Sequence, residues 1–297
     1  MKNPAPRLRP RREKDPPSAW RTPRARRLLA VLARYDSLAV AFSGGVDSTL
    51  LLCAARRALG GRVLAVTADT PLQSRSEIAF AVETARRLEI PHLLLRVPIL
   101  EQAAVRRNGP ARCYFCKRRL LREIRAAAGG RGFAVVAHGA NLDDLGDFRP
   151  GLRAAREMGV AEPLIEAGLD KAEIRRLSRG LGLPAWDRPA TACLASRIPY
   201  GRALSRRVLS AVEQAEEYLH ARGFAAVRVR HHGEIARIET GPEDFARLVA
   251  TPSLRRGIEQ AFRRLGFLFV ALDLGGYVAG SLNLAVAQAR GRKGERR

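Results

Sequence analysis

The stretch from Leu38 to Leu52, LAVAFSGGVDSTLLL, constrains the fold more than any other part of the sequence. Its first five residues form an apolar run as long as one buried strand, and an apolar pattern of helical spacing begins at Val46. Between them lies the glycine turn Ser43 to Gly45. A strand, a glycine turn and a helix start bring backbone N–H groups together at the positive end of the helix dipole. The stretch therefore predicts an anion-binding turn of the kind that holds a phosphate.

Polar side chains at fixed positions make this turn more specific. The hydroxyls of Ser43 and Ser48 can donate hydrogen bonds to phosphate oxygens, and the carboxylate of Asp47 suits a magnesium ion beside them. The loop is shorter than the Walker form and lacks the Lys of that form. A simple tight turn between strand and helix is the alternative interpretation.

The run from Ser43 to Ser48, SGGVDS, resembles the phosphate loop of the PP-loop ATP pyrophosphatases. Members of that superfamily cleave ATP between the α and β phosphates. They usually adenylate a carbonyl or carboxylate oxygen, and a nucleophile then displaces AMP. The resemblance implies that ATP and Mg2+ are bound by Ser43, Gly44, Gly45, Asp47 and Ser48, and it leaves the substrate open.

Strands and helices alternate on both sides of this loop. Strands are expected at 38–42, 62–67, 92–97 and 133–138, and helices at 46–59, 74–88 and about 117–128. This alternation predicts an α/β domain with a doubly wound parallel sheet, HUP-like, in which ligands bind at the carboxyl ends of the strands. Thr67 and Asp69 end the second strand, so we expect them beside the ATP, with backbone groups near Thr67 facing the adenine. Pro163 to Ile165 is predicted to be a short fifth strand.

The chain is predicted to consist of four parts. Residues 1–27 and 290–297 are basic tails expected to be disordered, residues 28–203 form the PP-loop domain, and residues 204–289 form a smaller α+β domain for substrate binding and oligomerisation. In this smaller domain helices are expected at 204–222, 242–249 and 254–265, and strands at 226–231, 234–239 and 267–272. Arg228 and Arg230 alternate with apolar residues, so both should project from one strand face and suit a phosphate monoester. A solvent-facing basic strand is the alternative.

A group of carboxylates follows the strand predicted at 133–138. Asn141, Asp143, Asp144 and Asp147 stand just past its end, at the edge where the phosphate loop is expected. Oxygen ligands at that position could assist Mg2+ or orient the substrate, and a solvated loop or helix cap is the alternative. We expect Asn141, Asp143 and Asp144 to belong to the nucleotide site.

Three of the four cysteines stand where metal chemistry is plausible. Cys113 and Cys116 form a C-x-x-C pair at a helix start, and Cys193 lies in a Pro-rich loop downstream. Structural zinc normally has four protein ligands, whereas three thiolates from two segments suit a 4Fe-4S cluster with one open iron. Unlinked thiols and an adventitious zinc site remain open alternatives. Cys53, on an apolar helix face, is expected to be a core residue.

Three further motifs narrow the resemblance from the superfamily to one family. They are Gly139-x-Asn141-x-Asp143-Asp144-x-x-Asp147-x-Arg149-Pro150-Gly151, Lys171-x-Glu173-Ile-Arg175 and Ala192-Cys193-Leu-Ala-Ser196-Arg197. Together they are similar to the LarE family, the sulfur transferases of nickel-pincer cofactor biosynthesis, over most of residues 30–285. The resemblance implies that a carboxylate of pyridinium-3,5-biscarboxylic acid mononucleotide is adenylated and that sulfur then replaces AMP. Two carboxylates are converted per cofactor.

The sulfur source divides this family into two branches. One branch sacrifices the sulfur of a single Cys that matches Cys193 and leaves dehydroalanine. The other carries three Cys, matching Cys113, Cys116 and Cys193, and is proposed to hold a 4Fe-4S cluster whose open iron carries a sulfide. Because all three are present here, the resemblance places this chain in the cluster branch, with a sulfide donor as a partner.

The remaining site residues are assigned by their positions relative to these motifs. The expected catalytic residues are Cys193, Asp47, Ser196 and Arg197, with the last two binding pyrophosphate or the substrate phosphate. Arg228 and Arg230, at positions equivalent to arginines of LarE-like proteins, are expected to grip the mononucleotide. The resemblance also implies a ring of several subunits, such as a hexamer.

The net charge of +24 raises the question of a nucleic acid partner. Residues 1–27 carry a net charge of +8 and residues 290–297 carry +4, so half of the excess lies in the predicted tails. A tRNA thiolase with the same cysteine pattern is the first alternative function, but the charge is concentrated in the tails and no RNA-binding module is recognised, so a nucleic acid is not the expected partner. A nucleotide-binding module without catalysis is the second alternative. No run of 18 apolar residues and no apolar leader segment is present, so we expect a cytoplasmic protein without a membrane span.

Overall fold

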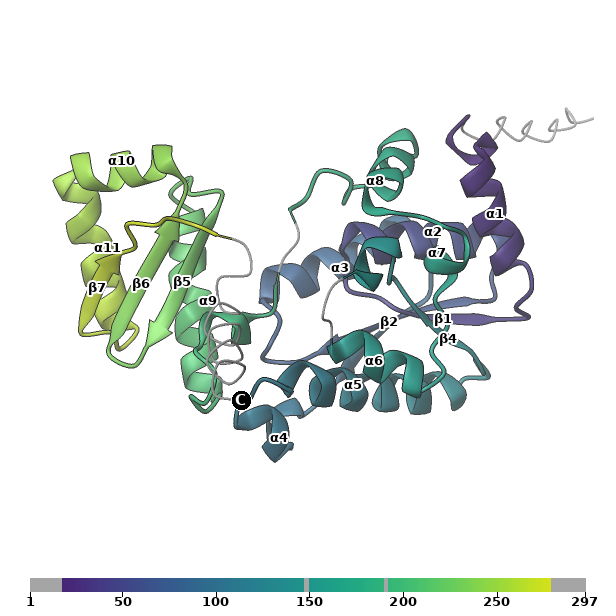
Figure 1. Ribbon diagram of the computed structural model, residues 1–297, viewed down its shortest axis with the longest axis horizontal. Coiled ribbons are helices and arrows are strands. Elements are labelled where there is room, and N and C mark those ends of the chain that lie inside the picture. Colours follow the sequence, from purple (N-terminus) through teal and green to yellow (C-terminus); the bar gives the residue numbers. More distant parts are fainter. Residues whose placement is uncertain (1–17, 147–149, 190–191, 279–297) are drawn as a thin grey trace, which may run out of the picture.

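The computed structural model describes residues 18–146, 150–189 and 192–278 of the 297-residue chain. These residues form a larger and a smaller α/β unit (Figure 1). The sheet of the larger unit has the strand order β3-β2-β1-β4, and all of its pairs are parallel. Its strands are β1 Leu38–Ala41, β2 Val63–Asp69, β3 His92–Arg96 and β4 Val136–His138. The predicted parallel sheet is confirmed.

Helices cover both faces of this sheet, as a parallel sheet requires. One face carries α1 Pro23–Leu32, α2 Val46–Leu59, α3 Arg75–Arg87 and α8 Lys171–Gly180, and the other carries α5 Arg112–Gly129 and α6 Pro150–Glu157. Shorter elements complete the unit: η1 Ser18–Arg21, η2 Ile99–Glu101, α4 Ala103–Arg106, η3 Leu142–Leu145, α7 Pro163–Glu166 and η4 Leu194–Arg197.

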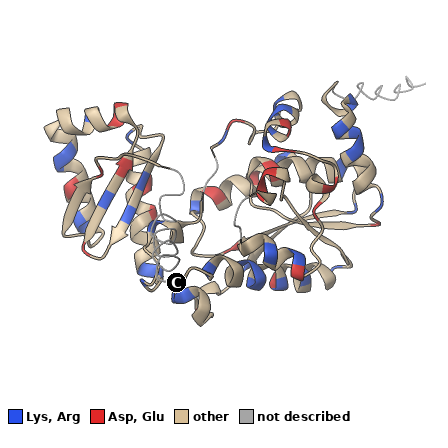
Figure 2. Ribbon diagram, viewed as in Figure 1, with Lys and Arg blue, Asp and Glu red and all other residues tan. Residues whose placement is uncertain are grey.

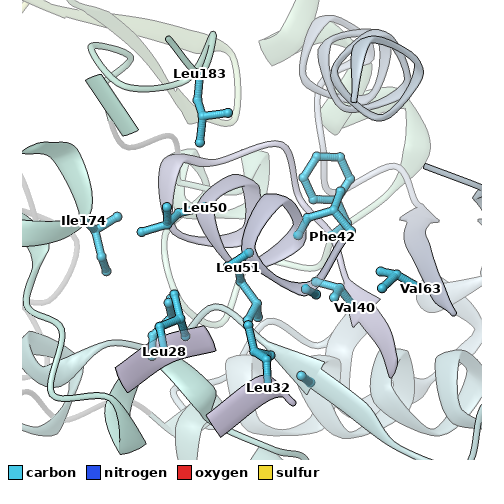
Figure 3. Close-up of a cluster of buried hydrophobic side chains, with 14 of the residues drawn as sticks. Leu28, Leu32, Val40, Phe42, Leu50, Leu51, Val63, Ile174 and Leu183 are labelled. Carbon is cyan, nitrogen blue, oxygen red and sulfur yellow. The ribbon is translucent and has the colours of Figure 1, made fainter. Parts of the chain in front are cut away.

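The two-residue period of β1 explains how both faces are filled. Leu38 and Val40 pack with Leu50 and Leu51 of α2 in one cluster, whereas Ala39 packs with α5 side chains in another. Figure 3 shows the first cluster, with side chains of α1, α2, β1 and α8 directed toward one another. The central strand β1 is therefore packed on both faces, and this packing fixes the position of the loop that follows it.

Two expectations about this unit differ from the structure. Pro163 begins the short helix α7, not a strand, because proline suits the first turn of a helix and cannot donate a ladder hydrogen bond. The parallel bridge to β4 falls on Ala161 instead. The expected boundary at residue 28 also falls inside α1, and Trp20 before it is buried. Residues 1–17 lie outside the described residues.

The smaller unit is a three-stranded sheet with three helices. Strands β5 Val227–His232 and β6 Ile235–Thr240 form an antiparallel hairpin, and β7 Phe269–Leu272 pairs with β6 in parallel. The helices are α9 Arg206–His220, α10 Pro242–Ala250 and α11 Pro252–Arg264. The predicted second α+β unit is therefore present.

Helix α9 packs on both units. Leu209 and Val212 belong to a cluster with side chains of the larger unit, whereas Ala215 and Leu219 belong to the core of the smaller one. A single helix with two apolar faces thus joins the units. Lys and Arg are spread over several outer helices of both units (Figure 2). Within the described residues no helix is long and apolar enough to cross a membrane.

Candidate active site

A cleft of about 700 Å3 opens at the carboxyl edge of the sheet, within the usual size range of ligand sites. Its walls come from the loop after β1, the start of α3, α8, the segment around Cys193, α9 and Arg228. Arg175 of α8 donates hydrogen bonds to the carbonyl oxygens of Trp186 and Arg188, at 2.7 and 3.0 Å, and so shapes the wall that leads toward Cys193. Both units therefore contribute to one site.

The loop after β1 has the form that the sequence predicts. Gly44 has a φ of +78°, a backbone conformation that favours glycine. A Cβ there would also lie 3.2 Å from Ala81 of α3, so the close packing of α3 favours glycine as well. Ser48 folds back on the loop, with its Oγ 3.2 Å from Ser43 Oγ and 3.1 Å from the carbonyl oxygen of Gly45. Helix α2 begins directly at Val46 and points its N-terminus into the cleft.

Asp47 is held by two side chains from other elements. Lys171 Nζ lies 2.5 Å from Asp47 Oδ2, and Asn141 Nδ2 donates to Asp47 Oδ1 at 3.1 Å. Lys171 lines the cleft and is a candidate site residue that the assignment from sequence missed. The available signal was its position as the first residue of a helix capped by Asp170, which fixes where the side chain begins.

The acidic residues after β4 act mainly as caps. Asn141 and Asp144 form a capping box on η3, and Asp143 Oδ2 accepts a hydrogen bond from the backbone N–H of Lys171 at 3.0 Å. Asp143 and Asp144 thus have the contacts expected of helix caps, the alternative to a metal or substrate role. Asn141 contacts the phosphate loop by its hydrogen bond to Asp47. Asp147 lies outside the described residues.

Gly139 lets the end of β4 approach the phosphate loop. A Cβ on Gly139 would lie 2.8 Å from the backbone nitrogen of Ser48 and 3.1 Å from the carbonyl carbon of Asp47. Both are backbone atoms, so a side chain here must displace the loop.

We therefore expect Gly139→Ala to weaken ATP binding at least about tenfold and to cost about 1–3 kcal/mol of stability. Calorimetric titration with a non-hydrolysable ATP analogue and urea unfolding measure the two effects. Gly129→Ala is the matched control, because no atom lies within 4 Å of a Cβ at that helical position. Equal ATP affinity in Gly139→Ala and wild type would contradict the role assigned to this contact.

Thr67 and Asp69 lie away from this cleft. Thr67 is fully buried, donates to the carbonyl oxygen of Phe42 at 2.8 Å and contacts His92 Nε2 at 2.9 Å. Asp69 pairs with Arg75 at 2.7 Å and lines a separate hollow of about 360 Å3. The side chain of Thr67 therefore supports the strand end beneath the loop.

Two of the three cysteines of interest contact the same arginine. Cys113 and Cys116 are the second and fifth residues of α5, and Cys193 precedes η4. Arg112 Nη2 lies 3.6 Å from Cys113 Sγ and 4.0 Å from Cys193 Sγ. Burial raises the pKa of Cys116 to about 12, with further contributions from the thiolates of Cys193 and Cys113. Of these three thiols Cys193 lines the cleft. Cys53 packs in the core of the larger unit, and burial raises its pKa to about 11.

This donor set suits a soft metal centre. Three thiols from two segments meet at a helix N-terminus among the apolar side chains of Phe115, Leu120 and Leu194. Within the described ranges, no three Cys, His, Asp or Glu side chains already stand at the spacing of a metal site. The residue types therefore fit a three-thiolate cluster, and their present arrangement is that of free thiols.

Ser196, Arg197 and Arg230 form the support of the Cys193 segment. Arg197 is 2% exposed, pairs with Glu216 of α9 at 2.9 Å and donates to the carbonyl oxygen of Ala192 at 2.7 Å. Arg230 pairs with Glu239 at 2.6 Å and donates to the carbonyl oxygen of Ser196 at 2.8 Å. Both guanidinium groups thus tie the segment to the smaller unit.

Replacing Glu216 by Gln should therefore both destabilise the protein and loosen the Cys193 segment. Breaking a buried ion pair costs about 3–5 kcal/mol, because the remaining charge stays buried. Urea unfolding measures the loss, and Glu259→Gln, which removes an exposed pair with Arg263, should cost no more than about 1 kcal/mol. Equal losses in the two variants would contradict a buried, structural Arg197.

Arg228 differs from Arg230 although both lie on β5. Its side chain is half-buried, lines the cleft and lies over the ring of Tyr277, 5.0 Å from the centroid. Its Nη1 donates a hydrogen bond to the carbonyl oxygen of Val227 at 2.7 Å. Of the two predicted phosphate ligands, Arg228 is the one that borders the cleft.

Comparisons with known proteins identify relatives of this chain. Residues 32–107 match the family model described as asparagine synthase. An uncharacterised protein of Synechocystis sp. is 42% identical over 84% of this chain and 92% of its own length. Pyridinium-3,5-bisthiocarboxylic acid mononucleotide synthase of Lactiplantibacillus plantarum is 36% identical over 89% of this chain and 95% of its own length.

The chain belongs to the LarE family. An uncharacterised protein of Methanocaldococcus jannaschii, 28% identical over 81% of this chain and 90% of its own length, is a more distant relative. The LarE match spans both units, so the cleft between them lies within the region shared with the synthase. The match to the asparagine synthase model covers the phosphate loop and the first three strands.

Proposed function

We propose that this protein is an ATP-dependent sulfurtransferase that converts the carboxylates of pyridinium-3,5-biscarboxylic acid mononucleotide into thiocarboxylates. The observation that carries the proposal is a single cleft bordered by the phosphate loop, by Cys193 and by Arg228. A nucleotide phosphate, a transferable sulfur and a second phosphate can meet there. The synthase from L. plantarum, which shares most of this chain's length, supports the choice of substrate.

The reaction has two steps. A carboxylate oxygen of the substrate attacks the α-phosphorus of ATP, forming an acyl adenylate and releasing pyrophosphate. Sulfide then attacks the acyl carbon, and the bond from that carbon to the AMP oxygen breaks. The products are a thiocarboxylate and AMP, and neither carbon nor sulfur is oxidised or reduced.

The first step depends on groups at the start of α2. The backbone N–H groups of Gly44 and Gly45 and the hydroxyls of Ser43 and Ser48 receive the pyrophosphate portion of ATP. Asp47 would hold Mg2+, which would supply charge neutralisation at the phosphates, and Lys171, which lines the cleft beside it, would donate to a phosphate oxygen. Asn141 remains on the other Asp47 oxygen and fixes its orientation. Positive charge placed where the leaving group develops lowers the barrier.

The second step depends on the position of Cys193 relative to the adenylate. Arg197 and Arg230, both held by carboxylates of the smaller unit, are proposed as positioning residues for this segment. Arg228 is proposed to bind the phosphate of the mononucleotide as a bidentate partner. Cys113, Cys116 and Cys193 would hold a 4Fe-4S cluster, which supplies a sulfide that can be replaced between turnovers.

The test is an anaerobic assay with ATP, Mg2+, sulfide and the biscarboxylic mononucleotide. The proposal predicts AMP and pyrophosphate in step with a product in which one, then two, oxygens are replaced by sulfur, measured by mass spectrometry. In a parallel assay with tRNA in place of the mononucleotide, thiolated tRNA would favour the tRNA thiolase alternative. Bound ATP that is never cleaved would indicate a module without catalysis.

A further inference from the structure

Arg112 is a buried cation without the usual partner. It is the first residue of α5, it is 3% exposed, and within the described part of the chain no Asp or Glu carboxylate pairs with it. Charged groups are rarely buried unless they are paired, since desolvation of an uncompensated charge is costly. The compensation must therefore come from other groups around the guanidinium.

The two ends of the guanidinium have different surroundings. Nη1 donates to neutral oxygens, Asn108 Oδ1 at 2.6 Å and the carbonyl oxygen of Ala195 at 2.9 Å. Nη2 lies near the sulfurs of Cys113 and Cys193, and the ring of Tyr200 lies 5.8 Å from the guanidinium carbon. A cysteine sulfur ligates a metal as the thiolate, so these two sulfurs are the contacting groups that become anionic when a metal centre binds.

The same arginine joins two distant segments. Cys193 lies 81 residues along the chain from Arg112, and Ala195 follows it in η4. Asn108 strengthens the link, because its Nδ2 donates to the carbonyl oxygens of Ile198 and Pro199 at 3.2 and 3.0 Å.

We propose that Arg112 is the positioning residue of the sulfur site: it holds Cys113 and Cys193 toward one shared ligand and balances the charge of their thiolates. The inference rests on the proposed function only in treating the three thiols as one site. A planar guanidinium can contact Asn108, Ala195 and both sulfurs at once, which the ammonium group of Lys cannot do. Arg112 thus acts through the cysteines and not on the substrate.

Arsenite tests this inference on the metal-free protein. Arsenic(III) forms one bond to each of three thiol sulfurs, each with loss of one water, and the sulfur–arsenic absorption reports binding. We expect wild type to bind arsenite through three thiols, Cys113→Ala to lose the three-thiol absorption, and Arg112→Gln to bind about tenfold more weakly. Arg118→Gln, an exposed residue of the same helix, should match wild type.

Arg112→Lys keeps a cation and covers the case in which Arg112→Gln does not fold. It should bind arsenite several-fold more weakly than wild type, because it cannot reach both sulfurs. In protein reconstituted with iron and sulfide, Arg112→Gln should show a more negative reduction potential, whereas Arg112→Lys should stay closer to wild type. A purely structural role would not separate the two variants in this way.

Wild-type arsenite affinity in folded Arg112→Gln, or in Arg112→Lys if the Gln variant does not fold, would overturn the inference. So would a reduction potential in Arg112→Gln equal to that of wild type. These measurements use neither ATP nor the mononucleotide. A protein that behaves as expected with arsenite yet forms no thiocarboxylate would therefore refute the proposed function and leave the role of Arg112 standing.

Discussion

Cys193→Ala is expected to abolish thiocarboxylate formation while leaving the adenylation step intact. Of the three thiols near Arg112, Cys193 is the one that lines the cleft, so its loss would remove the cluster ligand that borders the proposed site of sulfur transfer. The phosphate loop, Lys171 and Asn141 lie on other elements and keep their contacts. We expect product formation to fall at least about 1,000-fold, the scale seen when a group that acts directly on the substrate is removed. Substrate-dependent exchange of pyrophosphate into ATP should stay within about twofold.

The matched control for this variant is Cys53→Ala. Cys53 belongs to the core side of α2, and its raised pKa of about 11 keeps the thiol protonated and unreactive near neutral pH. This control should retain full thiolation activity. Thiocarboxylate formation at the wild-type rate by Cys193→Ala would place the sulfur chemistry elsewhere in the molecule.

Lys171→Ala is expected to have the opposite signature, a loss of adenylation. The ammonium group lies 2.5 Å from Asp47 in the cleft, where it would donate to the phosphates of bound ATP. Removing one preorganised charge of this kind usually costs about 100- to 1,000-fold in rate. Pyrophosphate exchange and AMP release should fall together by that factor, whereas arsenite binding at the thiols should be unchanged.

Arg176→Ala controls for effects on helix α8 itself. Arg176 is an exposed residue of the same helix, and its partner is Glu173. Its replacement should leave pyrophosphate exchange within about twofold of wild type, because Arg176 does not line the cleft. If Lys171→Ala retains wild-type exchange, its contact with Asp47 belongs to folding and not to catalysis.

The sequence predicts the architecture because the local sequence patterns agree with the tertiary packing of the segments that carry them. The run from Leu38 to Phe42 is buried on both faces, so an uninterrupted apolar pattern is what a central parallel strand needs. Gly44 and Asp47 follow at positions fixed by the strand end and the helix start. In the short segment that begins at Pro163, the sequence pattern is too brief to distinguish a strand from a helix. The proline at its first position favours the helix that forms there.

Long-range side-chain pairing is what the sequence could not supply. Arg197 and Arg230 are typical phosphate ligands by residue type, yet each meets a buried carboxylate, and nothing local identifies Glu216 or Glu239 as partners. Asp143 and Asp144 illustrate the same limit, since caps and metal ligands use the same side chains. Lys171 enters the site only because α8 packs on α2, a contact between segments more than 100 residues apart.

The measurement that tests the central claim most directly follows oxygen through the reaction. The mononucleotide is labelled with 18O in its carboxylates and incubated anaerobically with the protein, ATP, Mg2+ and sulfide. If an acyl adenylate forms and sulfide displaces AMP from it, each AMP released carries one 18O, and its amount equals the sulfur gained by the product. Unlabelled AMP, or phosphate and ADP as products, would contradict the proposed function.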